Sequence, residues 1–313
     1  MIPRILTDLE NSSRVLISGA GGGFDIFAGL PLYFWLKSKG KDVVLANLSF
    51  TELDLCEGFR PIPEILAVTA ETTGPSSYFP ELLLLRWLKD HGYQHPIYAI
   101  RREGTAGVSA AYRWLWETII PDTIILVDGG TDILMRGDEA GLGTPQEDIA
   151  SLAAVSALEQ AVRRYVICLG FGVDTFHGVC HAHFLENVAA LTEAYLGSWS
   201  LLADSPEFRF YEAACGYVHD RMPRRKSIVN SSIIASANGW FGDRHPTDRT
   251  AGSPLFLNPL MSQYWAFDLP AVAARNLYLG HIRETGSYHD LSFAIEMFRA
   301  RLPMQREWRD IPF

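Results

Sequence analysis

Apolar and polar positions alternate in blocks along the first half of the chain. Short apolar runs, typical of buried strands, cover 14–18, 42–48, 96–100, 124–127 and 165–170. Amphipathic stretches, typical of helices, cover 26–40, 81–92, 108–119 and 145–164. Because strands and helices take turns, the pattern indicates βαβ units. We therefore predict an α/β fold with a doubly wound, mostly parallel sheet, that is, a Rossmann-like three-layer sandwich.

The alternation weakens after residue 195. Ser227–Ala237 is rich in β-branched residues and is expected to be a strand, and 277–282 is also strand-like, whereas 291–302 reads as a helix. The proline-rich stretch 50–80 is expected to be a loop with short elements over the sheet edge. We predict a single α/β domain over 1–313, with core βα units in 14–195 and closing helices, loops and additional strands in 196–313.

Composition and charge narrow the class of partner. The 313 residues are 48% hydrophobic and 20% charged, an ordinary globular composition, and the net charge of −9 argues against a protein that tracks a phosphate backbone. The cysteines, at 56, 168, 180 and 215, are too scattered for a zinc ribbon or a disulfide scaffold. The sequence has no signal-peptide pattern and no apolar run long enough to cross a membrane, so we expect a cytoplasmic protein. We expect a small-molecule substrate or ligand as its partner, and neither nucleic acid nor a membrane. A homo-oligomer is possible.

A glycine loop follows the first predicted strand. It contains Gly21, Gly22, Gly23 and Asp25 and precedes a helix, so its backbone N–H groups can face an anion, although the spacing fits neither GxGxxG nor a Walker loop. Asp25 suits a sugar hydroxyl, an amine or a metal-bridged phosphate better than a bare phosphate. A tight structural turn without a ligand is the alternative. Two further candidates for substrate or anion binding lie on the next predicted strands, Asn47 and Arg101.

The stretch 123–148 combines a strand, glycines and many carboxylates. Asp128, Asp132, Asp138 and Glu139 stand out, and Asp148 is a plausible fifth. Carboxylates packed together repel one another at neutral pH, so a cation such as Mg²⁺, Mn²⁺ or Ca²⁺ is the economical explanation. We expect Asp128, Asp132 and Asp138 to hold the metal, with Asp128, Asp132 and Glu139 in catalysis; ribose hydroxyls or an amine are alternative ligands.

The end of that stretch, residues 144–148, also has a purely structural interpretation. Thr144 can cap a helix that starts at Pro145, with Glu147 three residues after the cap and Asp148 favoured by the helix dipole. We therefore interpret residues 144–148 as the start of a helix, from which one carboxylate also contributes to the site.

A third polar cluster follows the strand 165–170. Asp174 and His177 come directly after it, so we expect Asp174 to bind substrate and either His177 or Glu139 to transfer protons. His177 and His181 are four apart and would share a face of a helix, as metal ligands do, but Cys180 does not have the spacing of a Cys/His zinc site, so we favour one or two ligand-contacting histidines over a zinc centre.

Two resemblances can be stated from these motifs. The segments GAGGGFDIFAGLPL, VDGGTDILMRGDE and GTPQED resemble an uncharacterised domain-of-unknown-function family with a Rossmann-like core, which implies a fold but no activity. DGGTDILMRG is more weakly similar to the DGGNEIGMG signature of the D-glutamate cyclase family, through Asp128, Gly129, Gly130, Asp132 and Met135, with Thr131 in place of Asn. That similarity implies a metal-assisted reaction on an amino-acid-like substrate.

The sequence therefore favours an enzyme. We expect a metal-dependent hydrolase or lyase that acts on a small polar substrate, nucleoside- or nucleotide-like or amino-acid-like, between the glycine loop and the carboxylates. The alternatives are a non-catalytic nucleotide or metabolite sensor and a nucleotide-dependent transferase.

Overall fold

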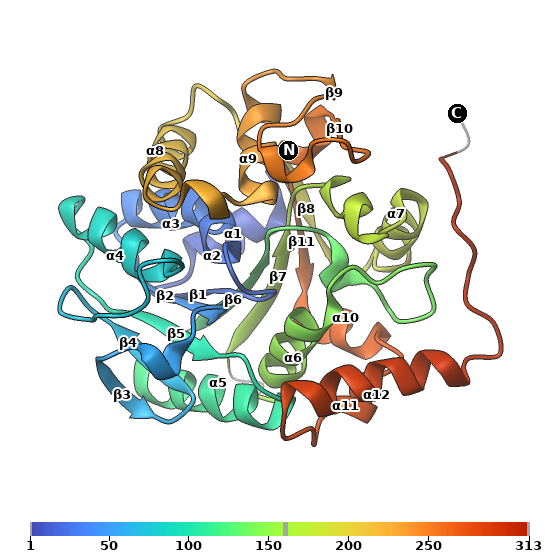
Figure 1. The fold of residues 1–313 in the computed structure, drawn as a ribbon, viewed down its shortest axis with the longest axis horizontal. Helices are drawn as coiled ribbons and strands as arrows, with labels where there is room; N and C mark the ends of the chain where they lie inside the picture. The colour runs from blue at the N-terminus through green and yellow to red at the C-terminus, as the bar shows by residue number, and fades with distance from the viewer. Residues whose placement is uncertain (1, 159–161, 312–313) are drawn as a thin grey trace.

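A large mixed sheet forms the centre of the protein (Figure 1). The computed structural model describes residues 2–158 and 162–311. The sheet contains β1 (Arg14–Gly19), β2 (Asp42–Ser49), β3 (Phe59–Ile62), β4 (Ile65–Val68), β5 (Ile97–Arg101), β6 (Thr123–Asp128), β7 (Arg163–Cys168), β8 (Tyr195–Ser200) and β11 (Gln263–Asp268). Their order is β3-β4-β5-β2-β1-β6-β7-β11-β8. The short strands β9 (Gly242–Asp243) and β10 (Phe256–Leu257) pair separately.

The five central strands, from β5 to β7, are parallel, and the pairs toward both edges are antiparallel. Every residue of β6 is buried, as are the last five of β1. Strands covered on both faces need apolar side chains on both faces, which explains the unbroken apolar runs of the sequence. Because these strands run in the same direction, the loops after β1, β6 and β7 leave the sheet at the same edge.

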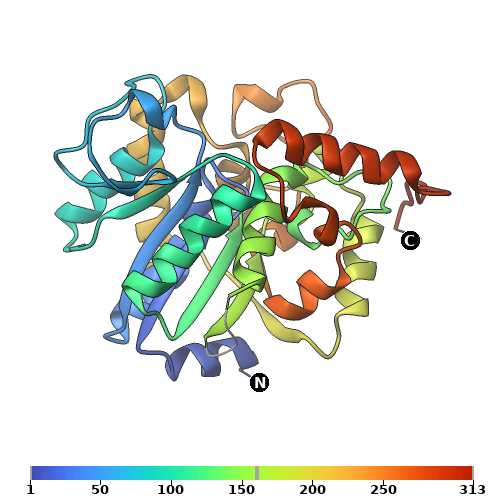
Figure 2. The ribbon, with the colours of Figure 1, turned by 90° about the horizontal axis from the view of Figure 1, so that it is seen from below.

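Helices pack on both faces of the sheet. They are α1 (Arg4–Glu10), α2 (Asp25–Ala28), α3 (Leu30–Ser38), α4 (Pro80–Asp90), α5 (Thr105–Ile119), α6 (Pro145–Ser156), α7 (His181–Ala190), α8 (Pro206–Arg221), α9 (Ile228–Ala237), α10 (Leu269–Arg275), α11 (Leu279–Ile282) and α12 (Tyr288–Arg301). One buried core joins the sheet to α1, α3, α4 and α8, and a second joins it to α5, α6, α10 and α12. Figure 2 shows α5 and α12 on the same side of the strands.

The segment between α2 and α3 packs closely against the sheet. Between α2 and α3, a side chain at Gly29 would come within 2.8 Å of the Cγ2 atom of Ile17 on β1. A glycine at this position therefore lets the chain between α2 and α3 approach β1 closely.

The mixed α/β fold with a large, mostly parallel sheet agrees with the sequence prediction, but several segments differ from it. Ser227–Ala237 was expected as a strand and forms α9, because the Ser227 side chain accepts a hydrogen bond from the backbone N–H of Asn230 at 3.1 Å and starts a helix. The strand expected at 277–282 is wrong as well, since Leu279–Ile282 forms α11. Local preference for β structure yields here to tertiary contacts.

Two other boundaries change. The stretch 50–80 contains the antiparallel pair β3 and β4, whose edge position tolerates Pro61. The helix expected over 145–164 ends at Ser156, and β7 begins at Arg163. The expected continuation over 159–161 lies outside the described residues.

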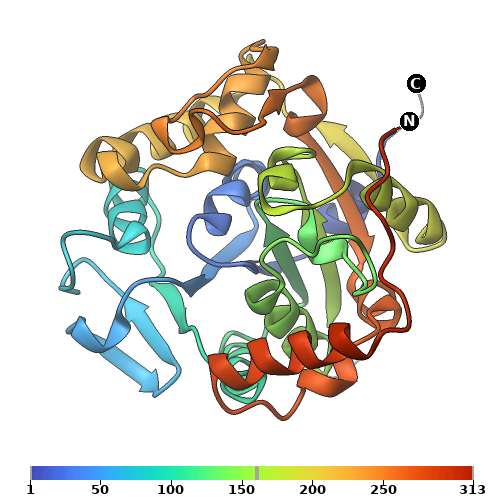
Figure 3. The same cartoon turned by 45° about the vertical axis from the view of Figure 1, so that its right-hand side comes forward.

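The last third of the described chain contributes to the same sheet. β8 and β11 pair with each other, and β11 pairs with β7. Figure 3 shows α8 and α9 on one side of the strand ends and α12 on the other. Among the described residues, none of the helices has both the length and the apolar character needed to cross a bilayer.

Candidate functional site

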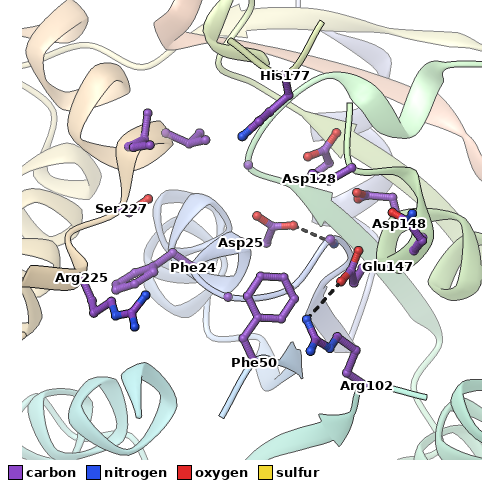
Figure 4. A pocket seen from close by; sticks show the side chains of 18 of the residues that line it. Phe24, Asp25, Phe50, Arg102, Asp128, Glu147, Asp148, His177, Arg225 and Ser227 are labelled. Atoms are coloured by element: carbon purple, nitrogen blue, oxygen red, sulfur yellow. Dashed lines mark hydrogen bonds and ion pairs between the residues drawn. The ribbon is translucent and has the colours of Figure 1, made fainter. Parts of the chain in front are cut away.

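A cleft of about 680 Å³ opens at the carboxyl ends of the central strands. Residues from loops far apart in sequence line it, and they include Gly21, Gly22, Gly23, Phe24, Asp25, Phe50, Tyr78, Arg102, Asp128, Asp132, Glu147, Asp148, Asp174, His177, Arg225, Ser227, Ile228, Val229, Arg249 and Tyr288. The size falls in the range of small-molecule sites. Figure 4 shows carboxylates on one wall, with Arg225 and Ser227 on the other.

The glycine loop after β1 forms the floor of the cleft. Gly22 and Gly23 have φ angles of 89° and 61°, which residues with a side chain rarely adopt, and a side chain at Gly22 would meet the ring of Phe50. Beneath the loop, the Asn47 side-chain amide donates to the carbonyl of Gly23 at 3.0 Å. Asn47 was predicted to bind substrate, but it does not line the cleft; it holds the loop that does.

Three aspartates meet where β1, β6 and α6 converge. Carboxylate oxygens of Asp25, Asp128 and Asp148 all lie within 4.8 Å of one another, a spacing that could hold a metal ion. Asp25 begins α2, Asp128 ends β6, and Asp148 lies in the first turn of α6. The Oδ1 atom of Asp148 is buried and has no hydrogen-bond partner among the described residues, whereas Asp25 accepts from the Gly21 N–H at 2.7 Å and Asp128 from the Ile133 N–H at 3.1 Å.

Glycines give these carboxylates their space. A side-chain carbon at Gly21 would lie 2.5 Å from an oxygen of Asp148, and one at Gly129 would lie 2.9 Å from an oxygen of Asp25. Both distances are far shorter than an unstrained contact. The density of glycine that the sequence shows around the acidic residues is therefore steric: it lets three carboxylates approach one another.

Further acidic groups surround the three. Asp132 accepts from the backbone N–H of Thr144 at 2.8 Å, and Asp174 accepts from the backbone N–H of Thr131. His177, predicted as a proton-transfer group, is exposed and points into the cleft in Figure 4. The structure thus brings Asp132, Asp174 and His177 into one cleft with Asp128.

Burial and mutual repulsion change the acidity of the cluster. Burial raises the pKa of Asp25 to about 8, and the charges of Asp132 and Glu147 add to this against the backbone hydrogen bonds that lower it. Burial also raises the pKa of Asp128 and Asp148 well above the ordinary value, and neighbouring carboxylates add to both shifts. The cluster can therefore stay fully ionised at neutral pH only if a cation compensates it.

Guanidinium and aromatic groups form the rest of the cleft wall. Arg102 lies 5.3 Å from the ring centre of Phe50 and 4.7 Å from that of Tyr288, and its Nη1 is 3.7 Å from a carboxylate oxygen of Glu147. Arg225 lies just before α9. Arg102 therefore lies on the side of the carboxylates, paired with Glu147, whereas Arg225 lies across the cleft from them (Figure 4).

Asp138 and Glu139, predicted as metal ligand and catalytic acid, are not among the residues that line the cleft. Arg136 and Arg306 pair with Asp138 at 3.0 and 3.1 Å, so its charge is already compensated. Glu139 is fully buried and accepts from the N–H groups of Arg136 and Gly137 and from the Asn187 amide at 2.8 to 2.9 Å. Asp138 and Glu139 therefore stabilise the loop between β6 and α6 through contacts outside the cleft.

Arg101 also lies outside the cleft. Its guanidinium forms two hydrogen bonds with the carboxylate of Asp54 and contacts Glu103 at 3.2 Å, and its neighbour Arg102 is the residue that lines the site. Consecutive residues after a strand point in different directions, so the choice between the two arginines was not available from the sequence.

The helix start predicted at Thr144 and Pro145 is confirmed, since α6 begins at Pro145 with Glu147 and Asp148 in its first turn, but the capping contacts differ from those expected. The Thr144 side chain makes no capping bond to α6, and its N–H and hydroxyl both donate to Asp132. Glu147 is buried and faces Arg102 instead of the N–H of Thr144. Similarly, His177 and His181 share no helix face, because Gly178 separates the short 3₁₀ helix Val173–His177 from α7.

Several cleft residues had no clear signal in the sequence. Arg225 and Arg249 lie in charged stretches that are typical of solvated loops, and Phe50, Tyr78 and Tyr288 resemble ordinary aromatic positions. Asp148 was named only as a plausible fifth carboxylate, with a helix start as its other explanation. Only the fold shows that these residues face one space.

Comparison with curated proteins and with solved structures gives no match. Residues 76–298 match the family described as "Protein of unknown function (DUF1152)", a range that contains Asp128, Asp148 and Arg225 but starts after the glycine loop. Because the match spans more than half of the chain, the predicted membership of an uncharacterised family is confirmed: the protein belongs to the DUF1152 family of proteins of unknown function.

Proposed function

We propose that the protein is a metal-dependent hydrolase or lyase that acts on a small polar substrate in the cleft. The observation that carries the proposal is Asp148, whose buried Oδ1 lacks a hydrogen-bond partner among the described residues and lies beside Asp25 and Asp128. A buried carboxylate oxygen without a hydrogen-bond partner is costly unless it binds a ligand. A divalent cation would satisfy it and neutralise its two neighbours.

The strand order supports a site at this place. Numbered along the chain, the parallel strands run β5-β2-β1-β6-β7, so the chain turns from one half of the sheet to the other between β1 and β6. We infer a doubly wound, Rossmann-like arrangement, in which ligands bind at that change of direction, beyond the carboxyl ends of the strands. Asp25 follows β1 and Asp128 ends β6, on the two sides of this point.

The donor set favours a hard cation. All three groups offer carboxylate oxygens, which suit Mg²⁺, Mn²⁺ or Ca²⁺ and do not suit a soft metal. Asp25, Asp128 and Asp148 would hold the ion, in place of the set with Asp132 and Asp138 that the sequence favoured. Asp132 would support the site through its own hydrogen bonds to Thr144.

The remaining groups fit the parts of a hydrolytic or lyase reaction. When bound, the metal would polarise a substrate oxygen or lower the pKa of a water. His177 is exposed at the cleft, within electrostatic reach of Asp132, and would transfer the proton to or from the substrate. The glycine loop, held by Asn47, would orient the substrate against the three aspartates.

Metal binding by matched variants tests the proposal. We expect the wild type to bind Mn²⁺ or Mg²⁺ in calorimetric titrations and Asp148→Asn to lose that binding while remaining folded. Asp138→Asn, which removes a carboxylate of the same loop outside the cleft, should retain it. A wild type that binds no divalent cation, or equal binding by all three proteins, would overturn the proposed site.

Turnover decides between an enzyme and a sensor. We expect metal-dependent release of product from a panel of nucleosides, nucleotides and amino-acid derivatives, lost in Asp148→Asn. Ligand-induced thermal stabilisation without turnover of any stabilising compound would instead favour a metabolite sensor.

A further inference from the structure

We propose that the wall opposite the three aspartates is a phosphate subsite, so that the substrate is a small organic phosphate. This inference deepens the proposed function and rests on it for the reacting end of the substrate. The phosphate would bind between Arg225, Arg249 and the start of α9, and the polar body of the molecule would extend to Asp25, Asp128 and Asp148.

Two guanidinium groups converge on this wall from different loops. Arg225 ends the short 3₁₀ helix before α9, and Arg249 belongs to the loop between β9 and β10. Arg225, Arg249 and the aromatic side chain of Tyr78 all line the cleft. Arg249 also donates to the carbonyl of Lys226 at 2.9 Å, which ties its loop to the segment of Arg225.

Neither guanidinium is neutralised. Among residues 2–158 and 162–311, no carboxylate lies within 4.0 Å of a charged nitrogen of Arg225 or Arg249. The third arginine that lines the cleft, Arg102, differs from them because it lies 3.7 Å from a carboxylate oxygen of Glu147. Two uncompensated positive charges in one cleft suit a dianion, and a phosphate monoester carries about −1.5 to −2 at pH 7. A single carboxylate would need only one arginine.

The start of α9 completes the wall. Ser227, Ile228 and Val229 line the cleft. The Ser227 side chain already accepts from the Asn230 N–H, and the N–H groups of Ile228 and Val229 have no acceptor within the helix, so they favour an anion. This helix start is held firmly. The His219 ring accepts from the Ser227 N–H at 3.1 Å, and the buried amide of Asn230 donates to the Phe24 carbonyl at 3.1 Å.

Those bonds join the two walls. Phe24 directly precedes Asp25, so Asn230 connects the start of α9 to the acidic end of the cleft. Burial lowers the pKa of His219 to about 4, so its ring is neutral at physiological pH and can accept the Ser227 hydrogen bond. Buried contacts therefore hold the start of α9 in place relative to the acidic end of the cleft.

The two subsites should cooperate. The acidic wall repels a phosphate, and a divalent cation bound at the three aspartates removes most of that repulsion. Metal binding is therefore expected to tighten phosphate binding, and phosphate binding must tighten metal binding by the same factor.

The test uses ribose 5-phosphate and ribose as probes, titrated into the full chain with and without Mn²⁺. We expect the phosphorylated sugar to bind, ribose to bind at least tenfold more weakly, and Mn²⁺ to tighten the former. Arg225→Ala should weaken the binding of ribose 5-phosphate at least tenfold. Its affinity for Mn²⁺ should stay within twofold of the wild-type affinity. Arg224→Ala is the matched control, because Arg224 is the exposed neighbour that does not line the cleft.

The outcomes separate this inference from the proposed function. The phosphate subsite would be overturned if ribose and ribose 5-phosphate bound with equal affinity. It would also be overturned if the Arg225 and Arg224 variants lost ribose 5-phosphate affinity to the same extent. Mn²⁺ binding that survives in that case keeps the metal site. Conversely, phosphate binding that depends on Arg225 in a protein that binds no metal would keep the subsite and reject the metal-dependent reaction. Because Arg225 is exposed, the variant is expected to fold, and circular dichroism checks this.

Discussion

Asp25 provides the sharpest test of the electrostatics in the cleft, through the replacement Asp25→Asn in metal-free protein. Its pKa rises from 3.8 to about 8, mainly because of burial. A carboxyl group whose folded pKa is raised binds its proton more tightly when folded, so its contribution to stability is complete below pH 3.8 and is lost as pH rises toward 8. Asparagine has nearly the same shape and no titration, so the difference between the two proteins isolates this group.

The magnitude follows from the pKa interval. At about 1.4 kcal/mol for each pH unit, the rise from 3.8 to about 8 corresponds to a ceiling on the order of 6 kcal/mol. The neighbouring carboxyl groups take up protons in place of Asp25, which reduces the value that is observed. We expect the unfolding free energy of the wild type, relative to Asp25→Asn, to fall by about 2 to 5 kcal/mol between pH 4 and pH 9.

Urea unfolding at a series of pH values, in the presence of a chelator, measures this difference. Added Mn²⁺ should remove most of the fall in the wild type, because the ion favours the ionised carboxylates, and should do so much less in Asp25→Asn. A difference that is constant over the whole pH range, or that grows as pH rises, would refute the reasoning about burial and repulsion in this cluster.

Three other replacements test separate parts of the site. Gly130→Ala would place a methyl group 2.7 Å from an oxygen of Asp174, so we expect a loss of about 1 to 3 kcal/mol in urea unfolding and at least tenfold weaker Mn²⁺ binding; unchanged binding would contradict the steric argument. Glu139→Gln turns an amide N–H toward buried donors, so we expect a loss of about 2 to 4 kcal/mol of stability and an unchanged affinity for Mn²⁺. Unchanged stability with weaker Mn²⁺ binding would instead show that Glu139 belongs to the metal site. Asn230→Ala breaks the link between the cleft walls, so we expect about 2 to 3 kcal/mol lower stability and weaker ribose 5-phosphate binding, whereas the exposed Asn238→Ala should change neither.

Much of the fold could be read from local pattern. The buried strands, the helices that alternate with them and the acidic strand end at Asp128 follow from the periodicity of apolar residues, because neighbours in sequence decide which face of an element is buried. The errors came where that rule is weakest. α9 carries β-branched residues, but Ser227 caps it and Asn230 anchors it to Phe24, a contact across 206 residues that no local pattern reports.

The sequence by itself determined that carboxylates and glycines would gather at the ends of parallel strands, since the strand ends of such a sheet share one edge. Only the tertiary structure decided which of them face the cleft. Asp138 pairs with Arg306, which lies 168 residues away along the chain, and so leaves the site, while Asp148 joins it from the first turn of α6. The physical reason is that a carboxylate becomes a ligand only where no cation of the protein already compensates it, and that depends on contacts between distant segments.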